Sequence, residues 1–132
     1  MARCLLDSDV IIWFLRGRPD VRRWVRELSG DGPPCCSSLS VLEVAAGARA
    51  HEEAATRAFL ASLLIVAPDG DVAWRAGTMI RDYARHGVTI DMVDGVIAAT
   101  CLARGLLLAT CNVRHYPMPD LRFAPPAGPE HG

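Results

Sequence analysis

Residues 88–105 read VTIDMVDGVIAATCLARG, and the rest of the chain is organised around this stretch. It begins as a short extended segment, places Asp91 and Asp94 three residues apart, and continues as an almost uncharged helix. Arg104 and Gly105 are typical of the C-terminal end of a helix. A helix with so little charge must be buried, so its two acidic residues have to emerge at the edge of the core and face something positive.

Short apolar runs alternate with segments of helical apolar spacing along the rest of the chain. The runs that predict strands are residues 3–6, 35–38, 64–67, 106–110 and 121–123. Further helices are predicted to start near residues 10, 19, 41, 52 and 71. Strands that alternate with helices indicate an α/β fold, with a central parallel sheet of about four or five short strands flanked by helices.

Length and composition favour one compact domain. The chain has 132 residues, of which 51% are apolar, and we predict a single domain over residues 1–123. Residues 124–132 hold three prolines and two glycines and are predicted to be a disordered tail. The net charge of -1 and the pI of about 6.4 provide no general positive field for nucleic acid, although all 14 basic residues are arginine.

Cysteine usage and hydropathy narrow the class of protein further. The five cysteines form an odd count without C-x-x-C spacing, and most lie in apolar runs, so we predict core residues and neither a disulfide framework nor a zinc site. No uncharged apolar stretch approaches the roughly 20 residues that span a bilayer. We therefore expect a cytoplasmic protein without a membrane segment.

Several polar residues follow the predicted strands. If the sheet is parallel, Asp7, Glu43, Asp94 and Asn112 all lie on the side where its strands end, in one crevice. Three carboxylates held close together repel one another unless a cation lies between them, so we predict that Asp7, Glu43 and Asp94 converge on one metal ion. Oxygen ligands favour Mg2+ or Mn2+. Such a cation lowers the pKa of a water molecule and neutralises charge on a phosphodiester, so no Ser or Cys nucleophile is needed.

The first two acids also have structural interpretations. Asp9 is better placed than Asp7 to cap the following helix, which leaves Asp7 for function. Glu43 follows Ser40 with the S-x-x-E spacing of a capping box, so on spacing alone capping and catalysis are equally good explanations of it.

In the organising stretch we assign Asp91 to the helix cap and Asp94, one turn further in, to the metal. His115 is interpreted as an ordinary surface residue. The residues that could support the site are Asp9, Asp91, Thr110 and Asn112.

Four segments, taken together, resemble the PIN-domain family and in particular its VapC-type toxin ribonucleases. They are LLDSDV at 5–10, SVLEVAAG at 40–47, DGVIAAT at 94–100 and LATCNVRHY at 108–116. The third matches a D-x-x-I-A-A-T pattern and the fourth a closing T-x-N-x-x-H-F pattern. Each motif is short, but four in order over nearly the whole chain are specific.

The resemblance implies an endoribonuclease that depends on Mg2+ or Mn2+ and cleaves RNA with a metal-activated water. It further implies the toxin component of a toxin-antitoxin system, a homodimer, and a cognate antitoxin whose segment blocks the acidic crevice. Asp7 and Asp94 match the family's metal-binding acids and Glu43 its catalytic glutamate. Many relatives carry a further aspartate in the closing segment, where this chain has Asn112 and His115, and Asn112 would then hold a metal-bound water.

Two alternatives stay open at this point. Asp7 and Asp9 also fit the D-x-D opening of haloacid-dehalogenase-like phosphatases, in which the first aspartate is the nucleophile. Those enzymes use a basic residue, usually lysine, and this chain has no lysine. The missing fourth acid also allows a catalytically inactive PIN-like binding module. Metal titration and an assay for RNA cleavage distinguish these alternatives.

Overall fold

The computed structural model describes residues 3–127. The strands are β1 (Cys4–Leu6), β2 (Cys35–Ser37), β3 (Leu64–Val66) and β4 (Leu107–Ala109). The α-helices are α1 (Ser8–Leu15), α2 (Pro19–Leu28), α3 (Ser38–Gly47), α4 (Glu53–Ala61), α5 (Gly70–Arg85) and α6 (Met92–Arg104), and single 3-10 turns lie at η1 (Ala50–Glu52) and η2 (Val113–His115). The predicted alternation of strands and helices is therefore confirmed.

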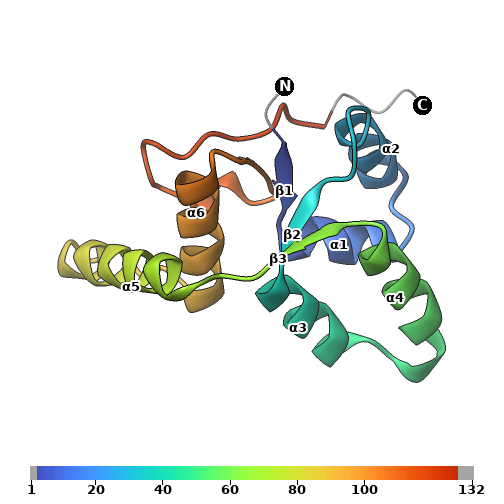
Figure 1. Ribbon diagram of the computed structural model, residues 1–132, viewed down its shortest axis with the longest axis horizontal. Coiled ribbons are helices and arrows are strands. Elements are labelled where there is room, and N and C mark those ends of the chain that lie inside the picture. The colour runs from blue at the N-terminus through green and yellow to red at the C-terminus, as the bar shows by residue number, and fades with distance from the viewer. Residues whose placement is uncertain (1–2, 128–132) are drawn as a thin grey trace.

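Within residues 3–127 the four strands form one parallel sheet in the order β3-β2-β1-β4. Helices α5 and α6 lie on one side of the sheet, and α1, α2, α3 and α4 lie on the other (Figure 1). The strand predicted at 121–123 is reduced to one parallel bridge between Leu108 and Phe123. An α/β domain with a covered parallel sheet, as predicted, is the result.

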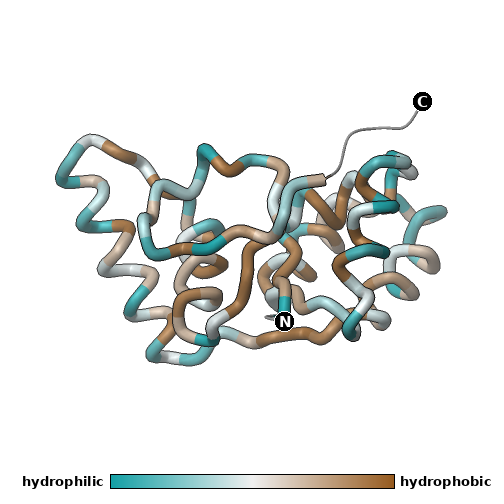
Figure 2. Tube along the Cα trace, turned by 90° about the horizontal axis from the view of Figure 1, so that it is seen from above, coloured by the Kyte–Doolittle hydropathy of each residue, from teal (hydrophilic) through white to brown (hydrophobic). Residues whose placement is uncertain are grey.

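The core has two parts, one on each face of the sheet. Leu6 belongs to the apolar cluster built with α1 and α2, and Leu5 belongs to the cluster built with α6. Both side chains are fully buried because β1 lies between β2 and β4 and is covered on both faces. Figure 2 shows the hydrophobic segments in the middle of the molecule and hydrophilic residues on the outer turns of the helices.

Helix α6 is buried as predicted. Ile97, Ala98 and Ala99 are inaccessible to solvent. The Asp91 side chain caps the helix by accepting a hydrogen bond from Val93 N at 3.0 Å, which confirms its predicted role as the N-cap. The C-terminal end lies at Gly105, whose φ of 65° is the left-handed conformation that glycine adopts without strain.

The predicted cap of α1 is wrong. Asp7, not Asp9, is the N-cap residue, and its Oδ1 accepts a hydrogen bond from Ser8 N at 2.8 Å. The helix begins directly after β1 ends, because the chain turns at Asp7 itself. Asp9 lies inside the first turn of the helix, and its side chain accepts hydrogen bonds from Cys111 and Asn112 instead.

The predicted capping box of α3 is also wrong. The helix begins at Ser38, and the Oγ of Ser37 accepts a hydrogen bond from Leu39 N at 3.1 Å. Ser40 and Glu43 therefore both lie within the helix, past its cap. The reason is that β2 passes into α3 without a linker, so the helix starts three residues earlier than the S-x-x-E spacing suggests.

The segment that follows β4 packs against the domain. Ala124 is buried, and the Trp24 Nε1 donates a hydrogen bond of 2.8 Å to the Pro125 carbonyl oxygen. Two residues beyond the predicted domain boundary are thus part of the packed structure, while residues 128–132 of the predicted tail lie outside the described residues.

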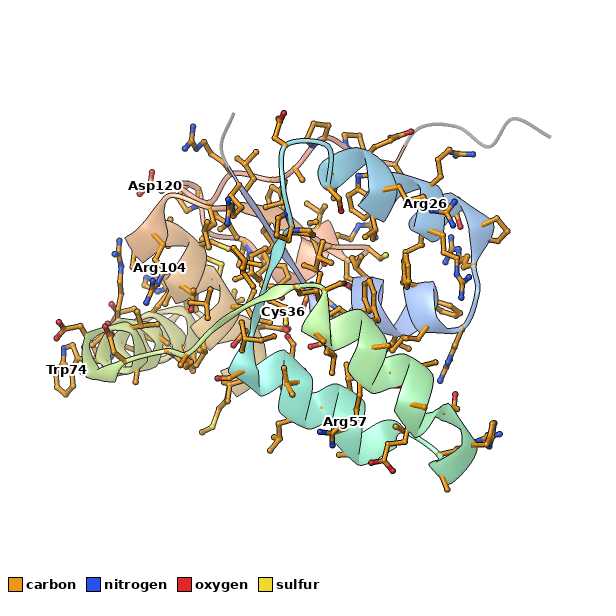
Figure 3. The ribbon with its side chains drawn as sticks, turned by 45° about the vertical axis from the view of Figure 1, so that its right-hand side comes forward. Arg26, Cys36, Arg57, Trp74, Arg104 and Asp120 are labelled. Carbon is orange, nitrogen blue, oxygen red and sulfur yellow. The ribbon has the colours of Figure 1, made fainter. Side chains whose placement is uncertain are left out.

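Side-chain placement agrees with the predicted cysteine environment. Cys4, Cys35, Cys36 and Cys101 are buried, and Cys111 is exposed. Figure 3 shows Cys36 on β2 in the middle of the molecule and Trp74 pointing outward from α5. No helix in residues 3–127 combines the length and the apolar character that a membrane span requires.

Candidate active site

The parallel sheet brings three separate segments to one place. Asp7 directly follows β1, Thr110 directly follows β4, and Asp94 lies in the first turn of α6. The Asp7 N–H donates to the Ala109 carbonyl oxygen at 2.9 Å, which joins the ends of the two strands. This is the side of a parallel sheet, beyond the carboxyl ends of its strands, where ligand sites form.

Asp7 is the buried centre of this arrangement. It is 6% exposed, and its Oδ2 accepts hydrogen bonds from the Thr110 hydroxyl at 2.9 Å and from the Tyr116 hydroxyl at 2.7 Å. Its Oδ1 accepts from Ser8 N, as described above. Three donors hold this carboxylate in one orientation, which offsets the cost of burying its charge.

Tyr116 links Asp7 to Asp94. The Tyr116 hydroxyl lies 3.2 Å from the Asp94 Oδ1, so one phenol oxygen contacts both carboxylates. Burial and the nearby charge of Asp7 raise the pKa of Tyr116, so the phenol keeps its proton. Burial also raises the pKa of Asp94, and the Asp7 charge adds to this effect. Two carboxylates therefore share a single hydroxyl proton.

Asp9 holds the loop that follows β4. Its Oδ2 accepts hydrogen bonds from Asn112 Nδ2 at 3.0 Å and from Cys111 N at 3.2 Å. Burial, and after it the charge of Asp7, raises the pKa of Asp9 to about 6. The Asp9 Oδ1 is buried without a hydrogen-bond partner. The Asn112 side chain is thus directed toward Asp9.

Glu43 reaches the site through Ser8. The Ser8 hydroxyl donates to the Glu43 Oε1 at 2.6 Å and also lies 2.8 Å from the Ser40 Oγ. Ser8 is the residue that follows Asp7, so one buried serine separates Glu43 from the buried aspartate. Glu43 itself is exposed and borders a cavity of about 540 Å³ that Arg16 and Arg49 also line.

A second opening lies on the other side of Asp94. A cavity of about 380 Å³ is lined by residues 88–91, Asp94, Arg114, His115 and Pro117. The His115 Nδ1 lies 3.8 Å from the Asp94 Oδ2, and His115 and Arg114 are both exposed. Asp91 borders the same cavity, on the side where it caps α6.

The donors suit a hard divalent cation. Asp7 and Asp94 offer carboxylate oxygens that carry more negative charge than one phenol proton offsets. Among the residues that the structure describes, no three His, Cys, Asp or Glu side chains are grouped closely enough to hold an ion by themselves. Mg2+ is commonly bound by one or two carboxylates and several waters, so the pair Asp7 and Asp94 fits it without a third protein ligand.

The predicted residues are thus connected in two ways. Asp7 and Asp94 meet at the Tyr116 hydroxyl, while Glu43 is connected to them through Ser8. Within residues 3–127, Glu43 is therefore not grouped with the other two acids as a third metal ligand, contrary to the prediction. Sequence reasoning missed Ser8 and Tyr116. The available signal for Tyr116 was its place at the end of the T-x-N-x-x-H-F pattern, where a hydroxyl is added to the expected aromatic ring.

Comparisons with known proteins agree with this geometry. A family model for the PIN domain matches residues 4–121. Ribonuclease VapC10 of Mycobacterium tuberculosis is 39% identical over 127 residues, which are 96% of this chain and 96% of that protein. Ribonuclease VapC19 of the same species is 37% identical over 120 residues, covering 89% of this chain and 96% of that protein. The structure of DNA-bound VapBC from Salmonella typhimurium superposes with a TM-score of 0.81 at 25% identity, covering 94% of this chain and 98% of that chain.

Proposed function

The chain belongs to the PIN-domain family, and from this premise we propose that it is a divalent-metal-dependent endoribonuclease, the toxin of a toxin-antitoxin pair. The observation that carries the proposal is the meeting of Asp7 and Asp94 at one hydroxyl, although they lie 87 positions apart in sequence. The relatives named as ribonucleases, which match along nearly their whole length, support the choice of RNA as substrate.

In this proposal Asp7 and Asp94 hold Mg2+ or Mn2+. When bound, the cation supplies positive charge to the cleaved phosphodiester and makes a water molecule more acidic. The three donors to Asp7 keep its carboxylate oriented before the ion arrives, which reduces the ordering that binding requires. Glu43, oriented by the Ser8 hydroxyl, accepts the proton of the attacking water.

Basic residues beside the acids suit a phosphate backbone. Arg114 and His115 line the cavity next to Asp94, and Arg16 and Arg49 line the cavity next to Glu43. The net charge of -1 gives no long-range attraction for nucleic acid, so these local arginines have to provide the phosphate contacts.

We further propose an antitoxin partner and a homodimer. The support for the antitoxin is the likeness to VapBC, a toxin-antitoxin complex. An antitoxin segment that covers the acidic crevice would exclude both the cation and the RNA. Co-expression with any small open reading frame found beside the gene, followed by purification of the complex, tests this partnership.

The geometry counts against a phosphatase with Asp7 as nucleophile. In such an enzyme the second aspartate is the acid/base, whereas here the Asp9 Oδ2 accepts hydrogen bonds from Cys111 N and Asn112 Nδ2 of the loop after β4. A trapped aspartyl-phosphate on Asp7 would nevertheless establish that chemistry.

The test is cleavage of RNA by the purified chain in Mn2+ and in EDTA. We expect cleavage only with the metal, and its loss in Asp7→Asn and Asp94→Asn. Glu43→Gln should keep the fold and lose most of the activity, since Gln can still accept the Ser8 hydrogen bond but cannot take a proton.

The matched control is Asp120→Asn, which removes one exposed carboxylate outside the site and should leave the rate unchanged. Cleavage in EDTA, or an Asp7→Asn variant as active as the parent, would refute the proposal. An inactive binding module would bind the antitoxin and cleave nothing under any metal condition.

A further inference from the structure

We propose that Tyr116 is a positioning residue, whose buried hydroxyl contacts both Asp7 and Asp94 and orients the two carboxylates toward one cation. This inference rests on the proposed function, because it concerns the same two acids. It assigns a role to a side chain that reaches the site from the loop after β4 and supplies no carboxylate of its own.

The ring of Tyr116 is held rigidly. Tyr116 is 3% exposed and belongs to the apolar cluster that contains Leu108 of β4 and Ile97 of α6. The Phe123 ring packs edge-on against it, with centroids 6.5 Å apart and planes at 67°. The Tyr116 N–H donates to the Val113 carbonyl oxygen at 3.0 Å, which fixes the backbone. The phenol oxygen therefore has one position, set by the core and not by the acids.

The two contacts of the hydroxyl are unequal. The Tyr116 oxygen lies 2.7 Å from the Asp7 Oδ2 and 3.2 Å from the Asp94 Oδ1. A phenol has one proton, which the two carboxylates share, so the hydrogen bond to Asp7 is the stronger and the one to Asp94 the weaker. One proton cannot satisfy both carboxylates, and a cation bound by both acids would supply the missing positive charge.

A hydroxyl at this point does two things for a cation. It fixes the Oδ2 of Asp7 and so the orientation of the whole carboxylate toward the ion. It also bridges the carboxylates of Asp7 and Asp94, which would otherwise repel each other and move apart. Groups that hydrogen-bond to metal ligands typically contribute about 10- to 100-fold to metal affinity.

The test compares Tyr116→Phe with Tyr83→Phe. The chain has two tyrosines, and Tyr83 lies on α5, packed against the same apolar cluster and outside the acidic site. Each variant removes one hydroxyl and keeps the ring. Mn2+ binding, measured by titration calorimetry or by the electron paramagnetic resonance of free Mn2+, should weaken about 10- to 100-fold in Tyr116→Phe and less than about twofold in Tyr83→Phe.

RNA cleavage gives a second readout. A positioning residue that acts through metal affinity predicts that Tyr116→Phe recovers most of its cleavage rate when Mn2+ is raised to saturation. A group that donated a proton to the substrate would leave the rate low at every Mn2+ concentration, and that result would overturn the positioning role.

A measurement on the unmodified chain avoids any loss of folding in the variant. With tyrosine labelled at the ring carbon that carries the hydroxyl, the two tyrosines give two resonances, which Tyr83→Phe assigns. We expect the Tyr116 resonance to shift on addition of diamagnetic Mg2+ and the Tyr83 resonance to stay in place. An unmoved Tyr116 resonance under Mg2+ saturation would contradict the inference.

Failure of this inference and of the proposed function are distinguishable. If Tyr116→Phe binds Mn2+ as tightly as the parent or more tightly, while Asp7→Asn binds none, the role of Tyr116 is wrong and the metal site stands. If the parent chain itself binds no Mn2+, the proposed function fails first and the inference fails with it.

Discussion

Replacement of Asp7 by Asn should separate the stability of the fold from the binding of the metal. In the variant the side-chain carbonyl can keep the hydrogen bond from Ser8 N, while the amide nitrogen takes the place of Oδ2. That nitrogen donates to the Tyr116 oxygen, and the phenol proton is then free to be donated to the Asp94 Oδ1. Each of the two contacts of the Tyr116 oxygen then has a proton of its own.

The magnitude follows from three effects at this centre. Two like charges separated by one oxygen atom repel by about 3 kcal/mol at an effective dielectric constant near 20, and the variant relieves this repulsion. It also loses the ionic strengthening of three hydrogen bonds, at about 1 kcal/mol each, which nearly cancels the gain. The remaining effect is the cost of burying the Asp7 charge, which the variant avoids. We therefore expect Asp7→Asn to be as stable as the parent in EDTA, or more stable by about 1 kcal/mol.

The assay is urea unfolding at pH 7, in EDTA and in Mn2+ at about 100 times the dissociation constant. The parent should gain about 2.7 kcal/mol from the metal and Asp7→Asn almost nothing, so the order of their stabilities reverses. Asp120→Asn should gain as much as the parent. A variant at Asp7 that is destabilised by several kcal/mol in EDTA, or that gains as much from Mn2+ as the parent does, would refute the reasoning.

Three further predictions concern the surroundings of the site. A Cβ at Gly95 would lie 2.7 Å from the Ile80 Cδ1 and 2.9 Å from its Cγ1, so Gly95→Ala should lose about 1 kcal/mol of unfolding free energy in urea, because overpacking outweighs helix propensity. Ile80→Val, which removes the Cδ1 and keeps the Cγ1, should relieve part of that loss. In EDTA the parent should lose at most about 3 kcal/mol of unfolding free energy as the pH rises from about 4 to about 6. The reason is that folded Asp9 keeps its proton up to a pKa of about 6, while the unfolded chain releases it near 3.8. Asp9→Asn should flatten this slope, and a flat curve for the parent would contradict the raised pKa of Asp9. Arg114→Gln should raise the KM for RNA several-fold with little change in kcat. It should also lower the salt dependence of RNA binding by about one phosphate contact. An unchanged KM would show that Arg114 does not contact the RNA.

Local sequence was sufficient for the architecture and for one cap. The stretch at 88–105 carries too little charge to be exposed, and the alternation of apolar runs with helical spacing leads to a covered parallel sheet. Asp91 was identified as the cap of α6 because capping depends only on a side chain and the backbone two residues further along. Such contacts can be predicted from neighbours in the chain.

Tertiary structure decided which acid does what. In sequence Asp9 is the better placed cap, but β1 ends at Leu6, so the helix starts at once, Asp7 caps it and Asp9 turns toward Asn112. Ser40 and Glu43 fit a capping box, yet β2 ends at Ser37, and this last residue of the strand is the N-cap of α3. In both places the end of a strand, set by its pairing in the sheet, determines where the next helix begins.

The hydroxyl of Tyr116 is the clearest case of a role that no local pattern reveals. It meets Asp7 across 109 positions of sequence and Asp94 across 22, and both contacts depend on the register of β4 beside β1 and on the packing of α6 against the sheet. Local rules depend on backbone groups a few residues away. A hydrogen bond between distant side chains exists only after the whole core has brought them together.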